Sequence, residues 1–381
     1  MKKTLSRSLN LSALLQKKTH FLFGPRSVGK TTLIKEQLSK ALYIDLLDSN
    51  YYLRLAQNPN MLSEFIQKQH SIVVIDEIQK LPILLDEIHR LIELKNIRFL
   101  LTGSSAKKLK NKNVNLLGGR AWKAVLLPLT SQEIPNFNLE YYLNRGGMPH
   151  IYLSKNYQDE LKNYVNLYIR EEIMAESLIR RLDYFTKFLD VIALNNGEEL
   201  HYQGLASDAG VPAKTFQNYI QILEDTLVGF PLYPFQMTKK RKAITRSKFF
   251  LFDIGIVNFL TRRGKILPKS ELFGKAFEHF IVLELRAYLA YTEKNYFLSY
   301  WRSTSGFEVD LIIGDVWAFE IKATNMVSDK HLKGLKALKE EKCLKNYAII
   351  SQDPTERVVD GICIFPWKIF LKKLWNNELL S

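Results

Sequence analysis

The octapeptide from Gly24 to Thr31, GPRSVGKT, fits the pattern G-x-x-x-x-G-K-[ST] in full. It follows the apolar segment HFLF and opens TTLIKEQL, which predicts a strand, a loop and a helix in that order. Glycines let backbone N–H groups surround phosphates, and a helix start favours their negative charge. We predict that Lys30 reaches the β- and γ-phosphates of ATP and that the Thr31 hydroxyl holds Mg²⁺. The expected nucleotide-binding residues of this loop are Gly24, Pro25, Arg26, Ser27, Val28, Gly29, Lys30, Thr31 and Thr32.

Two acids stand at the end of the segment SIVVIDE. Its four apolar residues, Ile72 to Ile75, are typical of a strand that is buried on both faces. Asp76 is then placed to hold Mg²⁺, and Glu77 to orient the water that attacks the γ-phosphate. Acids that cap a helix would look the same. Because the phosphate-binding pattern lies upstream, we interpret Asp76 as a metal and nucleotide ligand and Glu77 as catalytic.

Two more residues near these motifs each have two interpretations. Ser104, at the end of IRFLLTGSS, would lie between the two motifs and sense the γ-phosphate, or it would belong to an ordinary serine-rich turn. Arg120, in LLGGRAW, would serve as an arginine finger for a neighbouring subunit, or it would be a surface arginine. The first interpretation of Arg120 implies a homo-oligomer.

The segment GFEVDLIIGDVWAFEIKAT, Gly306 to Thr324, predicts two short strands around Gly314-Asp315. Alternate residues of a strand face opposite sides. The apolar sides comprise Phe307, Val309, Leu311 and Ile313 in the first strand and Trp317, Phe319 and Ile321 in the second. If they coincide, the charged residues Glu308, Asp310, Glu320 and Lys322 share the other side. A two-residue turn would mix the sides, so we predict a three-residue loop that sets Asp310 near Ala318 and Glu320 across from Glu308.

Carboxylates that gather on one side of a sheet repel one another and lose solvation. A divalent cation would neutralise them and explain their presence. Lys322 lies two residues beyond Glu320 on the same strand, where its ammonium group would position or deprotonate a water molecule. The hairpin therefore predicts a metal site with Asp310, Glu320 and Lys322 as catalytic residues.

A helix is expected just upstream, from Lys275 to Ala290. Its buried arc would be Phe277, Ile281, Leu285 and Tyr288. Glu278 lies at the edge of this arc, where an ionised acid needs a partner. Glu284 is the second acid that this helix offers to the hairpin. The alternative for Glu284 is a structural acid that pairs with Arg286 or with a lysine elsewhere.

Composition limits the remaining possibilities. A chain of 381 residues predicts two or three domains. No apolar run approaches the roughly 18–20 residues of a membrane helix, so we expect no membrane association. Two cysteines without zinc spacing suggest a reduced, cytoplasmic compartment. The net charge of +15 favours a polyanionic partner.

The segment LASDAGVPAKTFQNYIQILEDTLVGFPLYPF has the layout of a helix-turn-helix with following strands. Its second helix would bury Phe216, Tyr219, Ile220 and Leu223 and present Lys214, Thr215, Gln217 and Asn218 to a DNA groove. The basic segment KKRKAITRSK would form a wing, with phosphate contacts from Lys239, Lys240, Arg241 and Lys242. A packing module that touches no nucleic acid is the alternative.

Several of these segments together resemble one prokaryotic family of AAA-type ATP-binding proteins. The resemblance rests on FLFGPRSVGKTTL, VVIDEIQKLP, FLLTGSS, GGRAWKAVLLPLTSQE, RGGMPHIYL, LFDIGIVNFL and GKAFEHFIVLEL, and it spans nearly the whole chain. It implies a winged helix in the middle and a C-terminal domain long described as of unknown function. The chain departs from the family at His150, where an acid is expected.

The D…E-x-K arrangement of the hairpin resembles the PD-(D/E)xK nuclease superfamily. That resemblance implies that Glu278, Asp310, Glu320 and the backbone carbonyl of Ile321 bind Mg²⁺, and that Lys322 activates the attacking water. The fold class expected is α/β multidomain: a P-loop AAA-type parallel sheet, a helical and winged-helix middle, and a mixed α/β restriction-endonuclease-like C-terminal domain. The expected limits are 1–138 for the ATPase, 139–195 for a helical linker, 196–262 for the winged helix and 263–381 for the nuclease-like domain.

The leading hypothesis is an enzyme that hydrolyses ATP, binds DNA and cleaves it with a Mg²⁺-dependent nuclease domain. One alternative is an ATPase regulator or switch whose nuclease-like domain is an inactive scaffold. The other is a protein-remodelling ATPase without a nucleic-acid partner.

Overall fold

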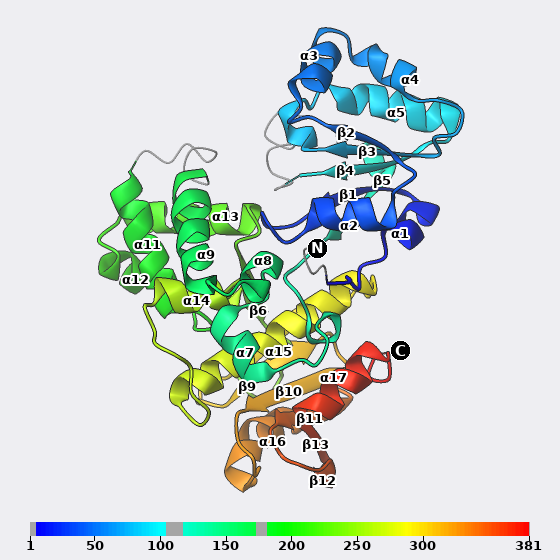
Figure 1. Cartoon of the computed structure of the whole chain (residues 1–381). Coiled ribbons are helices and arrows are strands. Elements are labelled where there is room, and N and C mark those ends of the chain that lie inside the picture. Colours follow the sequence, from blue (N-terminus) through cyan, green and yellow to red (C-terminus); the bar gives the residue numbers. More distant parts are fainter. Residues whose placement is uncertain (1–4, 104–116, 173–180, 381) are drawn as a thin grey trace. The chain divides into compact units, whose positions relative to one another are not determined.

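The computed structural model describes residues 5–103, 117–172 and 181–380 (Figure 1). The chain divides into two compact units. Unit 1 comprises residues 1–129, 148–150 and 225–228, and unit 2 comprises residues 130–147, 151–224 and 229–381. None of the helices in the described ranges combines the length and the apolar character that a membrane span requires.

Unit 1 contains, in its described residues, a five-stranded sheet in the order β2-β3-β4-β1-β5. The strands are β1 Thr19–Phe23, β2 Leu42–Asp45, β3 Ile72–Asp76, β4 Arg98–Thr102 and β5 Ala121–Val125. All neighbouring strands run parallel, which confirms the parallel sheet expected from the alternation of strand and helix patterns. Because β4 lies between β1 and β3, the phosphate-binding loop after β1 and the acids after β3 flank the end of β4.

The helices of unit 1 complete its core. They are α1 Leu11–Lys17, α2 Lys30–Gln37, α3 Ser49–Gln57, α4 Leu62–Phe65 and α5 Leu84–Lys95, with 3-10 turns at Pro59–Met61, Ile78–Lys80 and Leu117–Gly119. The sheet residues Phe21 and Phe99 and the α5 residue Ile88 belong to one buried cluster. Sequence analysis did not predict α1 and α3. Side-chain caps mark their starts: Asn10 accepts from the Ala13 N–H and Asp48 from the Asn50 N–H.

The first part of unit 2 is mainly helical, as expected. Two of its helices, α8 and α13, include residues that are assigned to unit 1. The elements are a turn at Ser131–Glu133, α7 Leu139–Arg145, α8 Pro149–Leu153, α9 Tyr157–Asn163, a π-helical stretch Tyr164–Glu172, α11 Leu182–Leu194, α12 Tyr202–Asp208, α13 Ala213–Asp225 and α14 Ile254–Leu260. Helix α13 buries Phe216, Tyr219, Ile220 and Leu223, which confirms the predicted apolar face.

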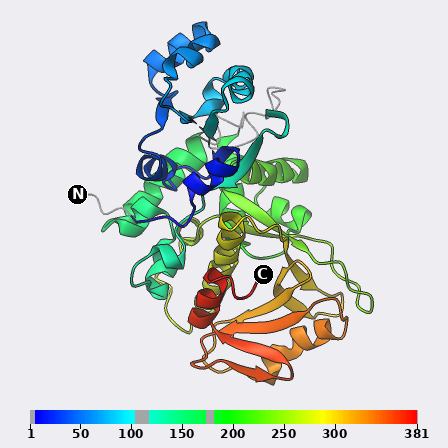
Figure 2. The same cartoon turned by 90° about the vertical axis from the view of Figure 1, so that its right-hand side faces the viewer.

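The second part of unit 2 is a mixed sheet in the order β12-β13-β11-β10-β9-β8-β6-β7, eight strands in the described residues (Figure 2). The strands are β6 Gly229–Pro234, β7 Lys248–Leu251, β8 Leu298–Arg302, β9 Glu308–Ile313, β10 Trp317–Lys322, β11 Asn346–Ser351, β12 Arg357–Val359 and β13 Ile362–Pro366. Strand β6 pairs with β8, so the sheet continues across the limit predicted at residues 262 and 263. The predicted winged helix and domain limits stay predictions.

Helices cover both faces of this sheet. They are α15 Glu271–Tyr291, a 3-10 turn Asp329–Leu332, α16 Lys333–Lys339 and α17 Trp367–Trp375. Phe319 of β10 packs on Phe370 of α17. Its neighbour Ala318 lies in a buried cluster with Leu335 of α16. Because successive strand residues face opposite sides, α17 and α16 cover opposite faces.

Gly146 and Gly147 follow the end of α7 and pack against the start of α14. Asp253 caps α14 by accepting from the Ile256 N–H (3.3 Å) and also accepts the Gly147 N–H (2.7 Å). Gly146 has φ +80° and ψ −176°, a conformation that is essentially restricted to glycine. A Cβ atom at Gly146 would overlap the Asp253 carboxylate. The Gly-Gly sequence therefore permits the close packing of these two helix ends.

We expect Gly146→Ala to lower the free energy of unfolding by about 3 kcal/mol or more, because backbone strain and steric overlap add. Chemical denaturation followed by circular dichroism measures this. Gly274→Ala is the matched control, since a Cβ atom there meets no atom within 4 Å in helix α15. The control should be neutral or more stable by up to about 1 kcal/mol. Equal stability of the two variants would contradict the packing role of Gly146.

Candidate functional sites: a nucleotide loop and an acid–lysine cluster

The loop between β1 and α2 has the backbone that its glycines predict. Ser27 (φ +63°) and Gly29 (φ +97°) are left-handed. A Cβ atom at Gly24 would overlap the carbonyl oxygen of Leu126, so glycine is required where the loop approaches the backbone after β5. Helix α2 begins at Lys30, which puts the unpaired N–H groups of its first turn beside the loop. The loop is therefore suited to an anion.

Lys30 is the first residue of α2, and its side chain folds back over the loop. Its ammonium group donates to the carbonyl oxygens of Gly24 (2.8 Å) and Pro25 (3.2 Å). Burial lowers the pKa of Lys30 to about 8, although the nearby Glu77 and Asp76 carboxylates oppose this change. Phosphate oxygens would replace these carbonyl partners and favour the charged form of the lysine.

Asp76, the last residue of β3, is buried and accepts three hydrogen bonds. Thr31 Oγ1 donates to Asp76 Oδ2 over 3.2 Å. The Tyr43 hydroxyl donates to the same oxygen, and the Thr102 hydroxyl donates to Oδ1. Hydroxyl and carboxylate oxygens are donors that Mg²⁺ takes, so the predicted pair of Thr31 and Asp76 fits this ion.

Glu77 has a left-handed backbone, with φ +60° and ψ +43°. Such strain costs on the order of 1 kcal/mol or more in a residue other than glycine, and it concentrates at functional sites. The Glu77 N–H donates to Thr102 Oγ1 over 3.2 Å, and its carboxylate accepts a hydrogen bond from Gln79 Nε2. These contacts hold a half-buried carboxylate next to Asp76.

The β9–β10 hairpin has the three-residue loop that we predicted, but its register differs. Ile313 pairs with Trp317, and Leu311 pairs with Phe319. Ala318 pairs with Ile312, and continuing this pairing sets Glu320 opposite Asp310. The predictions of Asp310 near Ala318 and of Glu320 across from Glu308 are therefore wrong. The loop is centred on Asp315 rather than Gly314. The reason is that Ile313 is buried and stays in the strand, while Gly314 (φ +52°) begins the turn.

The hairpin brings Asp310, Glu320 and Lys322 together. Lys322 Nζ lies 2.7 Å from Glu320 Oε1 and 3.5 Å from Asp310 Oδ2. The Ile321 N–H donates to Asp310 Oδ2 over 2.7 Å. Burial raises the pKa of Glu320 well above its usual range, and the Asp310 carboxylate raises it further. Burial alone would lower the pKa of Lys322, but the carboxylates of Asp310 and Glu320 outweigh this effect and raise it.

A second lysine, which sequence analysis did not identify, completes the group. Lys248 of β7 is buried, and its Nζ lies 2.7 Å from Glu308 Oε1 and 3.6 Å from Glu278 Oε1. Burial raises the pKa of Glu278 to about 7, against the opposing effect of Lys248. The acid–lysine cluster is thus Lys248, Glu278, Glu308, Asp310, Glu320 and Lys322. A lysine that opens the apolar segment KFFLF was the available signal.

The cluster does not present the predicted Mg²⁺ ligands in an assembled set. Among the residues that the structure describes, no three Asp, Glu, His or Cys side chains are placed to hold a metal ion. The physical reason is that Lys322 bridges Asp310 and Glu320 while Lys248 lies beside Glu278. The carboxylate oxygens of the cluster are nevertheless the kind of ligand that a divalent cation takes. Glu278 Oε1 and Glu320 Oε2 are buried and accept no hydrogen bond from the residues that the structure describes, although Lys248 Nζ lies 3.6 Å from Glu278 Oε1.

Glu284 is a structural acid, as predicted, but its predicted partners are wrong. Its carboxylate accepts the Ser131 N–H (2.6 Å) and the indole N–H of Trp375 (2.8 Å). Burial raises the pKa of Glu284 to about 7. Arg286 instead stacks its guanidinium group over the ring of Phe230. Glu284 therefore connects α15 to two segments that lie far from it in the sequence.

Three family models match successive parts of the chain. Residues 16–135 match "AAA domain", residues 136–266 match "Domain of unknown function (DUF8612)", and residues 273–370 match "Domain of unknown function (DUF4143)". The chain carries an AAA domain. It also carries the C-terminal domain of unknown function that the resemblance implied.

Relatives of the whole chain are distant. "Uncharacterized protein MJ1637" of Methanocaldococcus jannaschii is 25% identical over 429 residues, which cover 93% of this chain and 85% of the relative. Among solved structures, ORC1 of Aeropyrum pernix in complex with DNA is 13% identical with a TM-score of 0.25, covering 67% of this chain and 93% of its own. A Pif1 helicase from a complex at forked double-stranded DNA is 17% identical with a TM-score of 0.26, covering 42% and 52%. Overlaps with such low TM-scores carry no argument about this chain.

Sequence analysis missed four side chains that support the nucleotide site of the AAA domain. Tyr43 and Thr102 hold Asp76, and Gln79 holds Glu77. Arg7 donates to the carbonyl oxygens of Val28 (2.7 Å) and Leu127, and it thereby connects the phosphate-binding loop to the segment after β5. Thr102 had a signal, since it ends the strand next to both motifs. The other contacts join positions whose spacing has no fixed pattern.

The structure does not decide between the two interpretations of Ser104 or between those of Arg120. Ser104 lies outside the described residues. Arg120 pairs with Glu93, and both side chains are exposed. This contact agrees with a surface arginine, and the arginine finger stays a prediction.

Arg241, one of the predicted phosphate contacts, already pairs with carboxylates of the chain. The buried carboxylate of Glu341 accepts the N–H groups of Lys239 (2.8 Å), Lys240 (2.7 Å) and Arg241 (3.0 Å). The guanidinium group of Arg241 also pairs with Glu340 and Glu341. Because two carboxylates engage Arg241, the structure does not support its role as a phosphate contact. The other predicted DNA contacts, Lys239, Lys240, Lys242, Lys214, Gln217 and Asn218, have exposed side chains.

Proposed function

We propose that the AAA domain binds ATP with Mg²⁺ and hydrolyses it. The observation that carries this proposal is the hydrogen-bonded series Thr31–Asp76–Thr102, which the Glu77 N–H extends. This series connects the start of α2 to the ends of β3 and β4. It joins a hydroxyl and a carboxylate suited to Mg²⁺ with an acid suited to orient water.

Each residue has one role in this proposal. Lys30 turns from its own loop carbonyls to the β- and γ-phosphates. Thr31 and Asp76 would hold Mg²⁺, which when bound would supply positive charge to the phosphates. Glu77 accepts a hydrogen bond from the attacking water. Its strained backbone and the Gln79 contact keep the carboxylate in place.

The test is Mg²⁺-dependent release of phosphate from ATP, with Thr102→Val as the variant. Valine keeps the shape of threonine but removes the hydroxyl that holds Asp76 and the Glu77 N–H. We expect kcat to fall roughly 10- to 100-fold, as is typical when a residue that orients a ligand is lost. KM should change little, because Thr102 serves the two acids in this proposal. Thr292→Val, which removes a hydroxyl at the C-cap of helix α15 in unit 2, should leave the rate unchanged. Absence of hydrolysis by the wild type would refute the proposal.

We infer that DNA is a partner of the chain. The net charge of +15 and the exposed side chains of Lys239, Lys240, Lys242 and Lys214 support this inference. The ATPase rate with and without DNA at low salt tests it. A rate indifferent to DNA, together with no measurable DNA binding, would favour a protein-remodelling ATPase.

A second candidate function rests on two buried carboxylate oxygens, Glu278 Oε1 and Glu320 Oε2, that accept no hydrogen bond in the described part of the chain. We propose that the acid–lysine cluster takes a divalent cation and hydrolyses the DNA backbone. Four carboxylates face two ammonium groups in the cluster, and the Arg302 guanidinium group lies 3.8 Å from Glu308. A divalent ion would offset the negative charge that these cations leave. Such an ion would stabilise the charge that develops on the phosphodiester. Lys322, once displaced from Glu320, would hold or activate a water molecule. A self-neutralised ion-pair network on an inactive scaffold is the alternative.

Plasmid cleavage with Mg²⁺ or Mn²⁺ separates these two possibilities. We expect the wild type to cut and Lys322→Ala to cut at least about 100-fold more slowly, as for loss of a general acid–base group. Lys345→Ala removes another hairpin-adjacent lysine, one that pairs only with the exposed Asp315, and should cut normally. Calorimetry with Mn²⁺ reports binding without cutting, and Lys322→Ala should bind at least as tightly because the competing ammonium is gone. Equal cutting by the wild type and Lys322→Ala would remove the nuclease proposal.

A further inference from the structure

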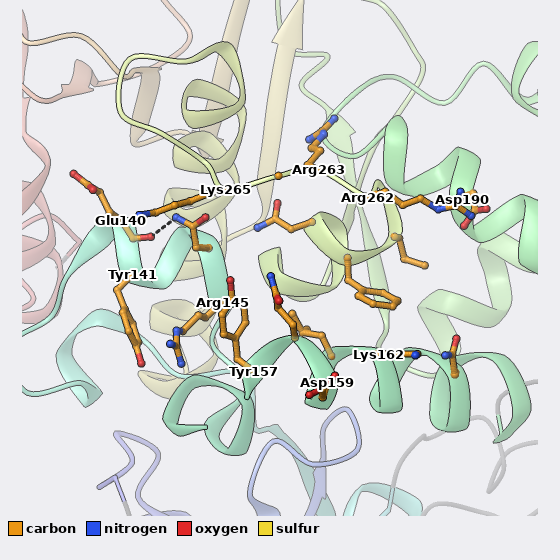
Figure 3. A pocket seen from close by; sticks show the side chains of 18 of the residues that line it. Glu140, Tyr141, Arg145, Tyr157, Asp159, Lys162, Asp190, Arg262, Arg263 and Lys265 are labelled. Carbon is orange, nitrogen blue, oxygen red and sulfur yellow. Dashed lines mark hydrogen bonds between the residues drawn. The ribbon is translucent and has the colours of Figure 1, made fainter. Parts of the chain in front are cut away.

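A cleft with a volume of about 1030 Å³ opens in unit 2, apart from the acid–lysine cluster (Figure 3). Helix α7 contributes Tyr141 and Arg145, and helix α9 contributes Lys162. The segment that follows α14 contributes Arg262, Arg263 and Lys265. In Figure 3, the side chains of this segment lie across the cleft from Lys162. No function assigned above uses this cleft.

Partly buried side-chain amides connect the walls of the cleft. Asn144 of α7 accepts the Ile266 N–H (2.8 Å) and donates to the Ile266 carbonyl (3.2 Å). Asn258 of α14 donates to the Leu143 carbonyl (2.8 Å). Arg262 takes a left-handed backbone (φ +52°) where the chain leaves α14. These contacts hold the segment after α14 against α7, so these two walls of the cleft keep a fixed position relative to each other.

Positive charge predominates in the cleft. Its cationic side chains are Arg145, Lys162, Arg262, Arg263 and Lys265, against the acids Glu140, Asp159 and Asp190. Within the described part of the chain, Lys162, Arg262, Arg263 and Lys265 make no ion pair and no side-chain hydrogen bond. Most charged groups around the acid–lysine cluster, by contrast, are paired. Four cations on facing walls without partners indicate an anionic ligand.

Aromatic rings lie beside these cations. The guanidinium group of Arg145 lies between two tyrosines, 4.1 Å from the Tyr141 ring centre and 4.3 Å from that of Tyr157. Phe259 also lines the cleft. All three rings are at least partly exposed. Rings interleaved with cations are typical of sites that stack bases and hold phosphates of a single nucleic-acid strand.

We propose that this cleft binds single-stranded DNA. Its volume lies at the upper end of the range of roughly 300–1,000 Å³ that is typical of ligand sites, so the cleft has room for at least one nucleotide. Lys162 and Arg262 would contact phosphates from opposite walls, and Tyr157 would stack on a base. This inference deepens the proposal that DNA is a partner: it names the form of DNA and the residues, and it requires neither ATP hydrolysis nor DNA cutting.

Fluorescence anisotropy with a labelled oligothymidylate and the full chain tests the cleft, in EDTA to prevent cutting. We expect Lys162→Gln/Arg262→Gln to weaken binding about tenfold and to reduce the slope of log K against log salt by about 1.4, since each phosphate contact on a single strand contributes about 0.7. Lys162→Arg/Arg262→Lys should keep both values near the wild type. Lys155→Gln/Lys269→Gln removes two exposed lysines outside the cleft and should change the slope less. Thermal unfolding checks that each variant is folded.

Competitors distinguish the source of the negative charge. We expect unlabelled single-stranded DNA to displace the probe more strongly than duplex DNA, ATP or polyglutamate. Displacement by polyglutamate at equal charge concentration would overturn the inference in favour of an acidic peptide. Equal affinity of the wild type and Lys162→Gln/Arg262→Gln would also overturn it while leaving DNA as a partner. Absence of all DNA binding by the wild type would overturn both.

Discussion

Lys30→Ala is expected to reduce the affinity for ATP by about 100-fold or more. The lysine would form two charge-assisted hydrogen bonds to phosphates, worth roughly 1.5–3 kcal/mol each, and 1.4 kcal/mol corresponds to a factor of ten. Part of this gain is offset, because the free protein already uses the ammonium group on Gly24 and Pro25. Titration calorimetry with Mg²⁺ and a non-hydrolysable ATP analogue measures the difference.

The control for this variant is Lys40→Ala, which removes an exposed lysine after helix α2 and should bind normally. The pH dependence gives a second check. Because the pKa of Lys30 is lowered to about 8, the lysine is charged below that pH and loses its proton above it. Wild-type affinity should therefore fall between about pH 8 and 10, and that fall should be absent in Lys30→Ala. Retained affinity in Lys30→Ala would show that the loop does not bind phosphates through this lysine.

Glu77→Gln is expected to reduce kcat by about 10²–10⁴-fold while ATP remains bound. That range is typical for loss of a general base or water-orienting acid. Glutamine keeps the length of the side chain and can still contact Gln79, but it cannot accept a proton from the attacking water. Pre-steady-state phosphate release, together with nucleotide binding, separates catalysis from affinity. The variant should hold unhydrolysed ATP.

Glu64→Gln is the control for Glu77→Gln, because Glu64 is an exposed acid on the short helix α4 of the same unit. It should hydrolyse ATP at the wild-type rate. If Glu77→Gln also did so, Glu77 would have no catalytic role. Loss of ATP binding in Glu77→Gln would instead show that its carboxylate is needed to shape the site, in conflict with the proposed division of labour.

The parts of the structure that sequence analysis anticipated are those that local pattern controls. The buried runs of β1, β3 and β4 were recognisable because each is short, apolar and followed by a loop. The apolar face of α13 followed from helical spacing, and the shared side of Ile313 with Trp317 and Leu311 with Phe319 followed from strand alternation. Such periodicity is set by backbone geometry and needs no knowledge of the remaining chain.

The structure adds contacts that the sequence did not reveal, mainly where distant segments meet. The hairpin register shifted because burial of Ile313 placed the turn one residue later. Arg241, an apparent phosphate ligand, is taken by Glu340 and Glu341, about 100 residues away. The predicted metal ligands are bridged by two lysines, and one of these, Lys248, comes from a strand outside the hairpin. None of these contacts has a spacing that a motif could reveal.

The amino-acid order alone determined which chemistry the chain can attempt. A glycine-rich loop before a helix, an acid pair after a buried strand and a hairpin with alternating charges each specify their local geometry, because only a few backbone torsions separate their residues. The tertiary structure decided which of these charges meet. It placed Thr102 between Asp76 and Glu77 and brought Lys248 to Glu278. Among the described residues, it also left four cations of one cleft without an ion pair. Ionic contacts act over a few ångströms, so they depend on how distant segments pack and not on their distance along the chain.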